Sequence, residues 1–242
     1  MTAHKKIHLR HELKYPIDFM QYQLLRKKLS LVLKPDPHTG PDGCYHIRSL
    51  YFDDFKNSAF FDKQAGVARR KKYRIRIYNY SDKLIKFECK AKYNQYVNKE
   101  CAKLSREEAD KIVAGDVSFL ANSENSLLRE FYLECRHKLL RPVVIVDYLR
   151  EAYIHPVGNV RITFDMGLHT NLGPISLFEH NTSTIRVDEH QFIILEVKFD
   201  DVLPLHIRGL FPTNIRPQAA LGKFSACRES TNALTGCSIT RF

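Results

Sequence analysis

Basic side chains recur at every second position in several segments of this chain, the spacing that places side chains on one face of a β-strand. Lys72, Arg74 and Arg76 show it most clearly, with apolar or aromatic residues between them. Further segments with this alternation carry His8, Arg10, Glu12 and Lys14; Lys86, Glu88, Lys90 and Lys92; Tyr148 and Arg150; Arg161, Thr163 and Asp165; and Glu196 and Lys198. Guanidinium groups bind phosphate oxygens through paired donors, and ammonium groups act as point charges. The pattern therefore predicts a site for a phosphate-rich anion.

An exposed sheet face is the simpler alternative, because an antiparallel sheet commonly buries one face and exposes the other. Two features favour an enclosed face. The polar positions hold mainly Arg, Lys and single carboxylates, with few Thr, Ser or Gln, and the chain supplies amphipathic helices to cover the apolar faces. With helices outside, the charged faces would point toward one another inside a barrel. A barrel of about eight strands has room for side chains or one small ligand.

An interior of this kind needs bound anions. Two unit charges about 4 Å apart interact by about 4 kcal/mol at an effective dielectric of about 20, so inward-facing cations repel one another strongly. The carboxylates of Glu12, Glu88, Asp165 and Glu196 are hard oxygen donors of the kind that Mg²⁺ or Mn²⁺ prefers. The sequence therefore predicts a polyanion beside a divalent metal that bridges to its phosphates.

The elements that would position these residues follow from hydrophobic periodicity and from capping and turn residues. Strands are predicted at 7–15, 45–52, 70–80, 84–92, 96–104, 143–153, 160–168 and 192–199. Helices are predicted at 18–33, 105–114, 126–139, 203–210 and 217–231. Pro16 is expected to end the first strand, Ser105 and Glu108 form a capping-box pattern, and Pro217 suits a first helical position. We expect one α+β domain over 1–242 with a core at 7–229: an antiparallel β-barrel tunnel of about eight strands with helices packed outside.

The composition agrees with a polyanionic partner. The chain has 242 residues, a net charge of +11 and a pI near 9.3, although charge by itself is also compatible with a protein that is merely basic. The six cysteines show no CxxC spacing, which argues against a zinc site. Cys89 and Cys135 fall inside apolar segments, where a reduced thiol acts as a small hydrophobe, so a reducing, cytoplasmic setting is expected. The N-terminal segment has no signal-peptide pattern, and no apolar run approaches the length of a membrane helix.

Several segments in order resemble one known family. They are RHELKY at 10–15, IRSLYFD at 47–53, RKKYRIRIY at 70–78, FECK at 87–90, YLR at 148–150, RITFD at 161–165, LEVK at 195–198 and GKFS at 222–225. In this order they resemble the VTC domain, the polyphosphate polymerase domain of the vacuolar transporter chaperone complex, and bacterial chains like it. That domain is one of the triphosphate tunnel metalloenzymes, alongside the CYTH proteins. Arg10 stands where CYTH triphosphatases have the first Glu of Glu-x-Glu-x-Lys, which favours the VTC branch. Gly222 stands where the family often has Ser.

The resemblance implies a metal-dependent enzyme that binds ATP by its triphosphate in a tunnel. The γ-phosphoryl group would pass to a growing polyphosphate chain and ADP would be released. The implied phosphate clamp is Arg74, Arg76, Lys90, Arg161 and Lys223. The further substrate contacts are Lys14, Arg48, Lys72, Lys99, Tyr148, Arg150 and Lys198. Glu196 is the principal implied metal ligand for Mn²⁺ or Mg²⁺, and Glu12 and Glu88 are weaker candidates that could equally orient a neighbouring cation.

Other functions remain open at this point. A triphosphatase would use the same clamp with water as the attacking group, and a non-catalytic polyphosphate-binding domain would need the clamp without Glu196. A nucleic-acid-binding protein is disfavoured, because the chain has no DNA- or RNA-binding motif. No serine or cysteine nucleophile pattern and no Gly-rich phosphate loop is present, but phosphoryl transfer depends on positioning and charge neutralisation instead. Without a membrane segment in this sequence, export of a product would require a membrane protein partner.

Overall fold

The computed structural model describes residues 10–93, 96–187, 192–211, 222–236 and 239. The chain divides into two compact units, which we describe separately. Unit 1 comprises Met1–Tyr45, Tyr148–Gly167 and Asp188–Leu221, and unit 2 comprises His46–Asp147, Leu168–Val187 and Gly222–Phe242. The expectation of a single domain over the whole chain stays a prediction.

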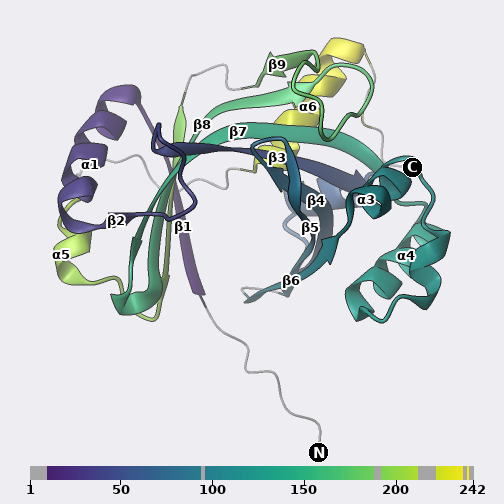
Figure 1. Cartoon of the computed structure of the whole chain (residues 1–242), viewed down its shortest axis with the longest axis horizontal. Coiled ribbons are helices and arrows are strands. Elements are labelled where there is room, and N and C mark those ends of the chain that lie inside the picture. The colour runs from purple at the N-terminus through teal and green to yellow at the C-terminus, as the bar shows by residue number, and fades with distance from the viewer. Residues whose placement is uncertain (1–9, 94–95, 188–191, 212–221, 237–238, 240–242) are drawn as a thin grey trace, which may run out of the picture. The chain divides into compact units, whose positions relative to one another are not determined.

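One antiparallel sheet follows the strand order β1-β10-β8-β7-β3-β4-β5-β6, with β2 paired to β7 and β9 to β8 (Figure 1). The strands are β1 (Arg10–Ile17), β2 (Lys34–Pro35), β3 (Cys44–Asp53), β4 (Arg69–Tyr78), β5 (Ser81–Tyr93), β6 (Tyr96–Leu104), β7 (Arg141–His155), β8 (Val160–Asn171), β9 (Thr184–Arg186) and β10 (Ile193–Asp200). The helices are α1 (Phe19–Val32), α2 (Ser58–Gln64), α3 (Arg106–Val113), α4 (Ser126–Lys138), α5 (Leu205–Arg208) and α6 (Lys223–Thr235), with 3-10 turns η1 (Ser118–Asn122) and η2 (Val157–Asn159). The predicted α+β class, with an antiparallel sheet whose main path has about eight strands, is confirmed.

The end of the first strand differs from the sequence-based prediction for a physical reason. The first strand does not stop at Pro16, which is paired with Ile194 inside β1. Because β1 is the last strand on its side of the path, the missing N–H of proline costs it little. The predicted residues 7–9 of this strand, and 217–221 of the last helix with Pro217, lie outside the described residues.

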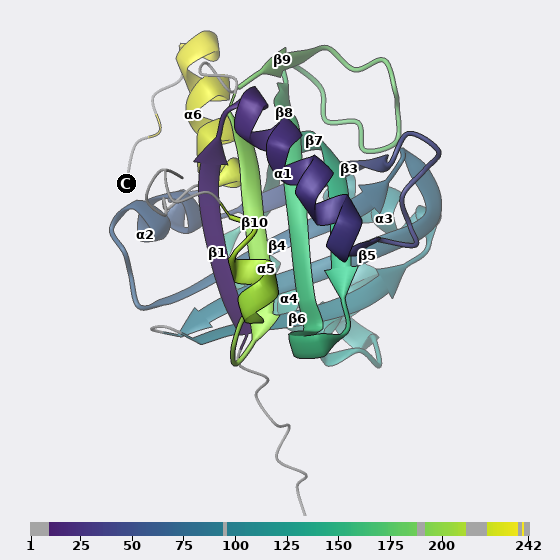
Figure 2. The ribbon, with the colours of Figure 1, turned by 90° about the vertical axis from the view of Figure 1, so that its left-hand side faces the viewer.

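Helix α1 covers the apolar face of the strands in unit 1 (Figure 2). Asp18 caps it: the Asp18 carboxylate accepts the Gln21 N–H at 2.8 Å, and Gln21 returns a bond to the Asp18 N–H at 3.1 Å. The residues that pack together are Ile17, Tyr22, Leu25, Leu29, Tyr153, Val160, Ile162, Phe164, Ile193, Leu195, Val197, Phe199 and Ile207. Their burial leaves the charged side of β1, β10 and β8 as the opposite face.

Unit 2 has the same construction, with α3, η1 and α4 on the apolar face of its strands. The capping box at Ser105 and Glu108 that starts α3 is present as predicted. The main packing residues are Leu50, Phe52, Tyr73, Ile75, Ile77, Ile85, Phe87, Ala102, Leu104, Ala109, Ile112, Leu120, Leu127, Leu128 and Phe131. Helices therefore cover one side of the strands in each unit, as the alternation of apolar residues requires.

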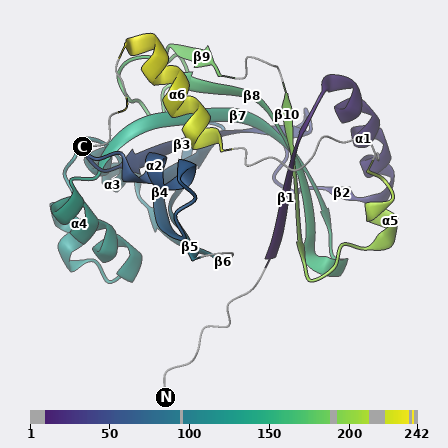
Figure 3. The ribbon, with the colours of Figure 1, turned by 180° about the vertical axis from the view of Figure 1, so that it is seen from behind.

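Helix α2 was not predicted from the sequence. It packs near β4 and contacts α6 (Figure 3). The available signal was the pair Asp53-Asp54, because both carboxylates accept backbone N–H groups at its start. Within the described part of the chain, no helix combines the length and apolar character needed to cross a bilayer.

Candidate functional site

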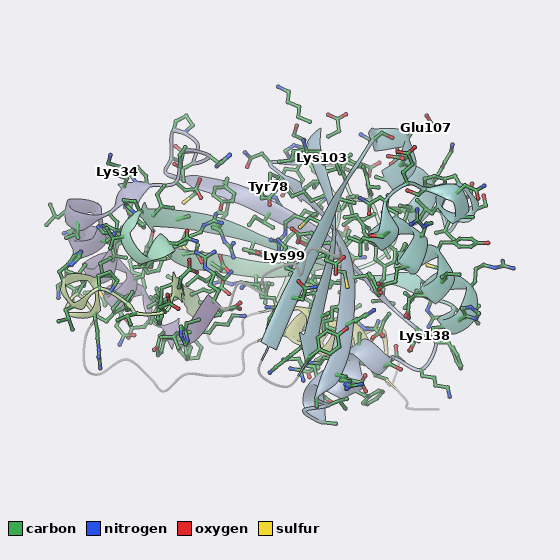
Figure 4. All side chains as sticks on the ribbon, turned by 90° about the horizontal axis from the view of Figure 1, so that it is seen from below. Lys34, Tyr78, Lys99, Lys103, Glu107 and Lys138 are labelled. Carbon is green, nitrogen blue, oxygen red and sulfur yellow. The ribbon has the colours of Figure 1, made fainter. Side chains whose placement is uncertain are left out.

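The polar face of unit 2 is a field of cations on three adjacent strands. It carries Arg70, Lys72, Arg74 and Arg76 from β4, Lys86, Lys90 and Lys92 from β5, and Lys99 and Lys103 from β6. The register places several of them directly opposite one another: Lys72 faces Lys90, which faces Lys99, and Arg76 faces Lys86. Figure 4 labels Lys99 and Lys103 on β6. Like charges opposite one another destabilise a sheet unless an added anion or a carboxylate offsets them.

Glu88 is the carboxylate within this field, and cations surround it. Arg74 reaches it through Nε at 2.7 Å and Nη2 at 2.6 Å, and the Lys99 Nζ lies 2.6 Å from its other oxygen. Burial alone would raise the pKa of Glu88, but Arg74, Arg76 and Lys99 lower it to about 2. Glu88 is therefore ionised at neutral pH, and it fixes the direction of Arg74.

Tyr51 connects the cations of β4 to the start of α6. The Arg74 Nη1 donates to the Tyr51 hydroxyl at 2.7 Å, and the ring of Phe224 lies 5.1 Å from that of Tyr51. Burial acts to raise the pKa of Tyr51, yet Arg74, Arg76 and Lys223 together lower it. The same Phe224 ring also contacts Lys72, whose ammonium lies 4.3 Å from the ring centre. Arg74, Arg76, Lys72 and Lys223 are thus brought to one place within unit 2.

Lys72 shows how strongly this place favours an added anion. Burial first, then the neighbouring Lys63, Arg70 and Lys90, lower its pKa to about 7, against the weaker opposing effect of Asp53. The folded, unliganded protein therefore releases a proton near pH 7 that an unfolded chain keeps to about pH 10. Lys72 consequently increases the free energy of unfolding as the pH rises from about 7 to about 10.

The same shift predicts a pH dependence of ligand binding. A phosphate chain beside Lys72 restores the charged form, so binding at pH 8 should take up protons and affinity should fall as the pH rises above about 7. Titration calorimetry at pH 8 in two buffers of different ionisation enthalpy measures this uptake. The Lys72→Arg variant stays charged and should lose it. Equal heats in both buffers for the unaltered protein would contradict the assignment.

The polar face of unit 1 carries mixed charges instead. Across the strands, Glu12 faces Lys198, which faces Arg161, and Lys14 faces Glu196. The Lys14 Nζ lies 2.8 Å from Glu12 and 3.4 Å from Glu196. Burial lowers the pKa of Lys14, but Glu196 and Glu12 raise it well above its ordinary value. These charges partly offset one another, whereas the polar face of unit 2 carries mainly cations.

Glu196 is the centre of the charged network in unit 1. It is buried, and its carboxylate lies 3.0 Å from the Lys198 Nζ and 3.6 Å from Arg150 Nη2. Arg150 also holds Asp165 with two bonds of 2.6 and 2.7 Å, and its Nη2 lies 3.4 Å from the Tyr148 hydroxyl. Burial lowers the pKa of Arg150, but Asp165, Tyr148 and Glu196 raise it well above its ordinary value. Arg150 is therefore a buried positioning residue for two carboxylates.

Arg161 is better placed for a ligand. Its Nη2 donates to Asp36 at 2.7 Å and to the Tyr45 hydroxyl at 2.8 Å, which fixes the plane of the guanidinium. Its buried Nε has no hydrogen-bond partner among the described residues. A buried donor left without a partner is costly, so this N–H is suited to an added oxygen. Asp36 and Tyr45, which orient Arg161, were not identified from the sequence.

Glu196, Glu12 and Glu88 are the carboxylates that could hold the implied metal, since Mg²⁺ and Mn²⁺ prefer oxygen donors. Among the described residues no group of three or more His, Cys, Asp or Glu is arranged to hold a metal ion. Mg²⁺ commonly binds through one or two carboxylates together with substrate phosphates, and Glu196 with Glu12 on the neighbouring strand matches that donor set. Glu88 belongs to unit 2 and is engaged by Arg74 and Lys99. Glu88 thus has the orienting role that was left open for it, but Glu196 is also ion-paired, with Lys198 and Arg150, so ion pairing does not separate the candidate metal ligands.

The structure does not bring Arg48 to the cationic face. Arg48 faces Ile77 of β4, on the side that the helices of unit 2 cover, and it is 1% exposed. Its guanidinium binds Asp147 at 2.7 Å and donates to the carbonyl of Glu179 at 2.5 Å. The prediction of a substrate contact is replaced by a structural ion pair. Alternation should have shown this, because Arg48 has the parity of the buried Leu50 and Phe52.

The chain is similar to solved structures and to one family model. No curated protein sequence matches the chain. Among solved structures, the PH1819 protein from Pyrococcus horikoshii OT3 is similar at 11% identity and a TM-score of 0.48, over 92% of this chain and 99% of that one. A "putative adenylate cyclase" from Bacillus halodurans is similar at 13% identity and a TM-score of 0.47, over 96% and 91% of the two chains. The model of the VTC domain matches residues 9–232, nearly the whole sequence, and the chain therefore belongs to the VTC domain family.

Proposed function

We propose that this protein is a metal-dependent polyphosphate polymerase that transfers the γ-phosphoryl group of ATP to a growing polyphosphate chain. The cation field of unit 2 is the observation that carries the proposal. On β4 the cations run from Arg70 to Arg76, a length of roughly 20 Å at about 3.3 Å per residue. A row of this length exceeds a single triphosphate group and suits a longer chain of phosphates. A triphosphatase acting on a short substrate would contact only part of this row.

The chemistry asks little of the protein beyond position and charge. An oxygen of the terminal phosphate of the chain attacks the γ-phosphorus of ATP. The bond from that phosphorus to the β–γ bridging oxygen breaks, and ADP leaves with the electron pair. The attacking oxygen is already anionic, so no general base is needed. In this proposal Arg74, Arg76, Lys90, Lys223 and Arg161 bind phosphate oxygens and orient the reacting groups.

The remaining residues have supporting roles in the proposal. Substrate contacts come from Lys14, Lys72, Lys99, Tyr148 and Lys198, while Arg150 and Glu88 position their neighbours. Glu196 and Glu12 would hold Mg²⁺ or Mn²⁺, which supplies charge neutralisation at phosphate oxygens. The family resemblance implies that the substrate lies in a tunnel, and the proposal keeps that implication. It also keeps a cytoplasmic location, with a membrane protein partner for any exported product.

The direct test is incubation of the protein with ATP and Mn²⁺ or Mg²⁺. We expect ADP in solution and long polyphosphate chains on a gel, and no product after chelation of the metal. Release of inorganic phosphate without chains would show a triphosphatase instead. Binding of polyphosphate with no turnover under any metal would show a non-catalytic binding domain.

Glu196→Gln gives the matching prediction for the metal. The amide keeps the shape but loses the charge that attracts a divalent cation, so activity should fall by about 100-fold or more while polyphosphate binding without metal persists. Rising metal concentration should restore part of the activity. The control is Glu107→Gln on α3, an exposed carboxylate paired to Lys111 at 2.7 Å. Unchanged activity and metal dependence in Glu196→Gln would remove Glu196 from the site.

A further inference from the structure

Helix α2 brings a lysine to the cation field that the sequence did not single out. Lys63 lies in the last turn of α2, and the start of that helix is fixed to the end of β3. The Asp53 carboxylate accepts the Ala59 N–H at 2.8 Å and the Phe60 N–H at 3.2 Å, and Asp54 accepts the Ser58 N–H at 2.8 Å. Phe60 is buried beneath the helix. These bonds give Lys63 a defined base from which its side chain extends.

The end of the Lys63 side chain lies against the backbone of Gly222. A Cβ added to Gly222 would lie 2.1 Å from the Lys63 Nζ and 2.6 Å from its Cε, far closer than atoms can approach. Gly222 has a φ of −124°, an extended conformation that any residue adopts. The glycine is therefore not required by the backbone at this position. Its missing side chain leaves the space that the ammonium group of Lys63 occupies.

This space adjoins residues already placed in the candidate site. Gly222 precedes Lys223 and caps the start of α6 without a side-chain hydrogen bond. Lys63 is also the charged neighbour with the largest effect in lowering the pKa of Lys72. The nearby Asp53 raises the pKa of Lys72 and so opposes the effect of Lys63 in part. The Asp53 oxygens also accept the N–H groups at the start of α2. Lys63, Lys72 and Lys223 therefore concentrate positive charge at one end of the field.

We propose that Lys63 is a further phosphate-binding residue, which reaches the phosphate chain through the space that Gly222 leaves open. This rests on the proposed function, since it assigns one more contact to the same anion. Lys63 takes the position that a side chain at residue 222 would fill, so an ammonium group lies there. The site gains a full charge where a Ser would offer a neutral donor. The expected consequence is tighter binding of phosphate chains, not a change in the reaction.

The test measures the dissociation constant for tripolyphosphate and for a longer polyphosphate by calorimetry without ATP. Lys63→Ala should weaken binding about tenfold, the usual effect of losing one charge-assisted hydrogen bond, and Lys63→Arg should retain most of it. Lys83→Ala is the matched control, because Lys83 is an exposed lysine of β5 with the parity of the buried Ile85 and Phe87. Equal affinities for Lys63→Ala and Lys83→Ala would overturn the proposal.

Gly222→Ala tests the link between the two residues. The added methyl group meets the flexible end of the Lys63 side chain, which must shift, so this variant should lose part of the affinity that Lys63→Ala loses, and the double variant should be no weaker than Lys63→Ala. Fully additive losses would show that Lys63 does not act through this space. Arg74→Ala separates the failures. If Arg74→Ala loses binding and Lys63→Ala does not, only the role of Lys63 is wrong, whereas absence of binding by the unaltered protein refutes the proposed function itself.

Discussion

Arg74→Ala is expected to reduce polyphosphate synthesis by about 100-fold to 1,000-fold while the protein stays folded, with its unfolding free energy within about 1 kcal/mol of the original. The loss of activity follows from the position of Arg74, which Glu88 and Tyr51 aim along the polar face of unit 2. The small change in stability follows from what remains. Glu88 keeps Lys99 at 2.6 Å, and removing one cation relieves repulsion within the row.

The measurements are kcat/KM for ADP formation and urea unfolding at neutral pH. Arg136→Ala is the matched control, because it removes the same charge from an exposed position on α4 of the same unit. Arg74→Lys should recover only part of the activity. The planar guanidinium can contact Glu88, Tyr51 and a phosphate at the same time, whereas the compact ammonium group of lysine cannot. A variant that is inactive because it no longer folds would show that Arg74 is a structural residue.

Arg48→Met is expected to have the opposite profile, with a loss of about 3–5 kcal/mol in unfolding free energy. Arg48 and Asp147 are both buried and are joined by bonds of 2.7 to 3.0 Å, so truncation of one leaves the other as an uncompensated charge. The carbonyl of Glu179 also loses its donor. The whole penalty therefore falls on stability and none of it on phosphate contacts.

A double-mutant cycle checks this explanation. Replacing both partners, as in Arg48→Met with Asp147→Leu, removes the unpaired charge and should regain a large part of the lost stability, because buried ion pairs can often be exchanged for apolar pairs. Urea denaturation of the two single variants and the double variant gives the coupling energy. If Arg48→Met is as stable as the original but binds polyphosphate poorly, Arg48 belongs to the binding site after all.

Side-chain alternation explains why Arg74 and Arg48 lie on opposite faces of the sheet. In β4 the side chains of Lys72, Arg74 and Arg76 lie on one face of the sheet. Those of Tyr73, Ile75 and Ile77 lie on the other face, as the sequence pattern predicts. The substrate contact expected for Arg48 comes from the family resemblance alone. Its parity along β3 puts it with Leu50, and the backbone period of two is a stronger constraint than the chemical type of the side chain.

Other features were beyond any local pattern. The carboxylate of Glu151 is buried under α1, where it accepts from the Tyr22 hydroxyl at 2.5 Å and from the Arg26 Nε at 2.9 Å. The partners are more than 100 positions apart in the chain, at separations of 129 and 125. Nothing in the neighbouring sequence marks such a pair. The role of Asp36 in fixing Arg161 was missed for the same reason, since they are 125 positions apart.

The sequence by itself determined the strands and their two faces, because side-chain alternation is a property of the local backbone and is written in consecutive residues. It also determined the family, because the ordered segments span nearly the whole chain. Only the tertiary structure decided which cations lie opposite one another, which carboxylates neutralise them, and that Lys63 meets Gly222. Those relations depend on strand register and helix docking, where residues distant in sequence come within a few ångströms, and Coulomb energies at that range decide whether a charge is paired or left for a ligand.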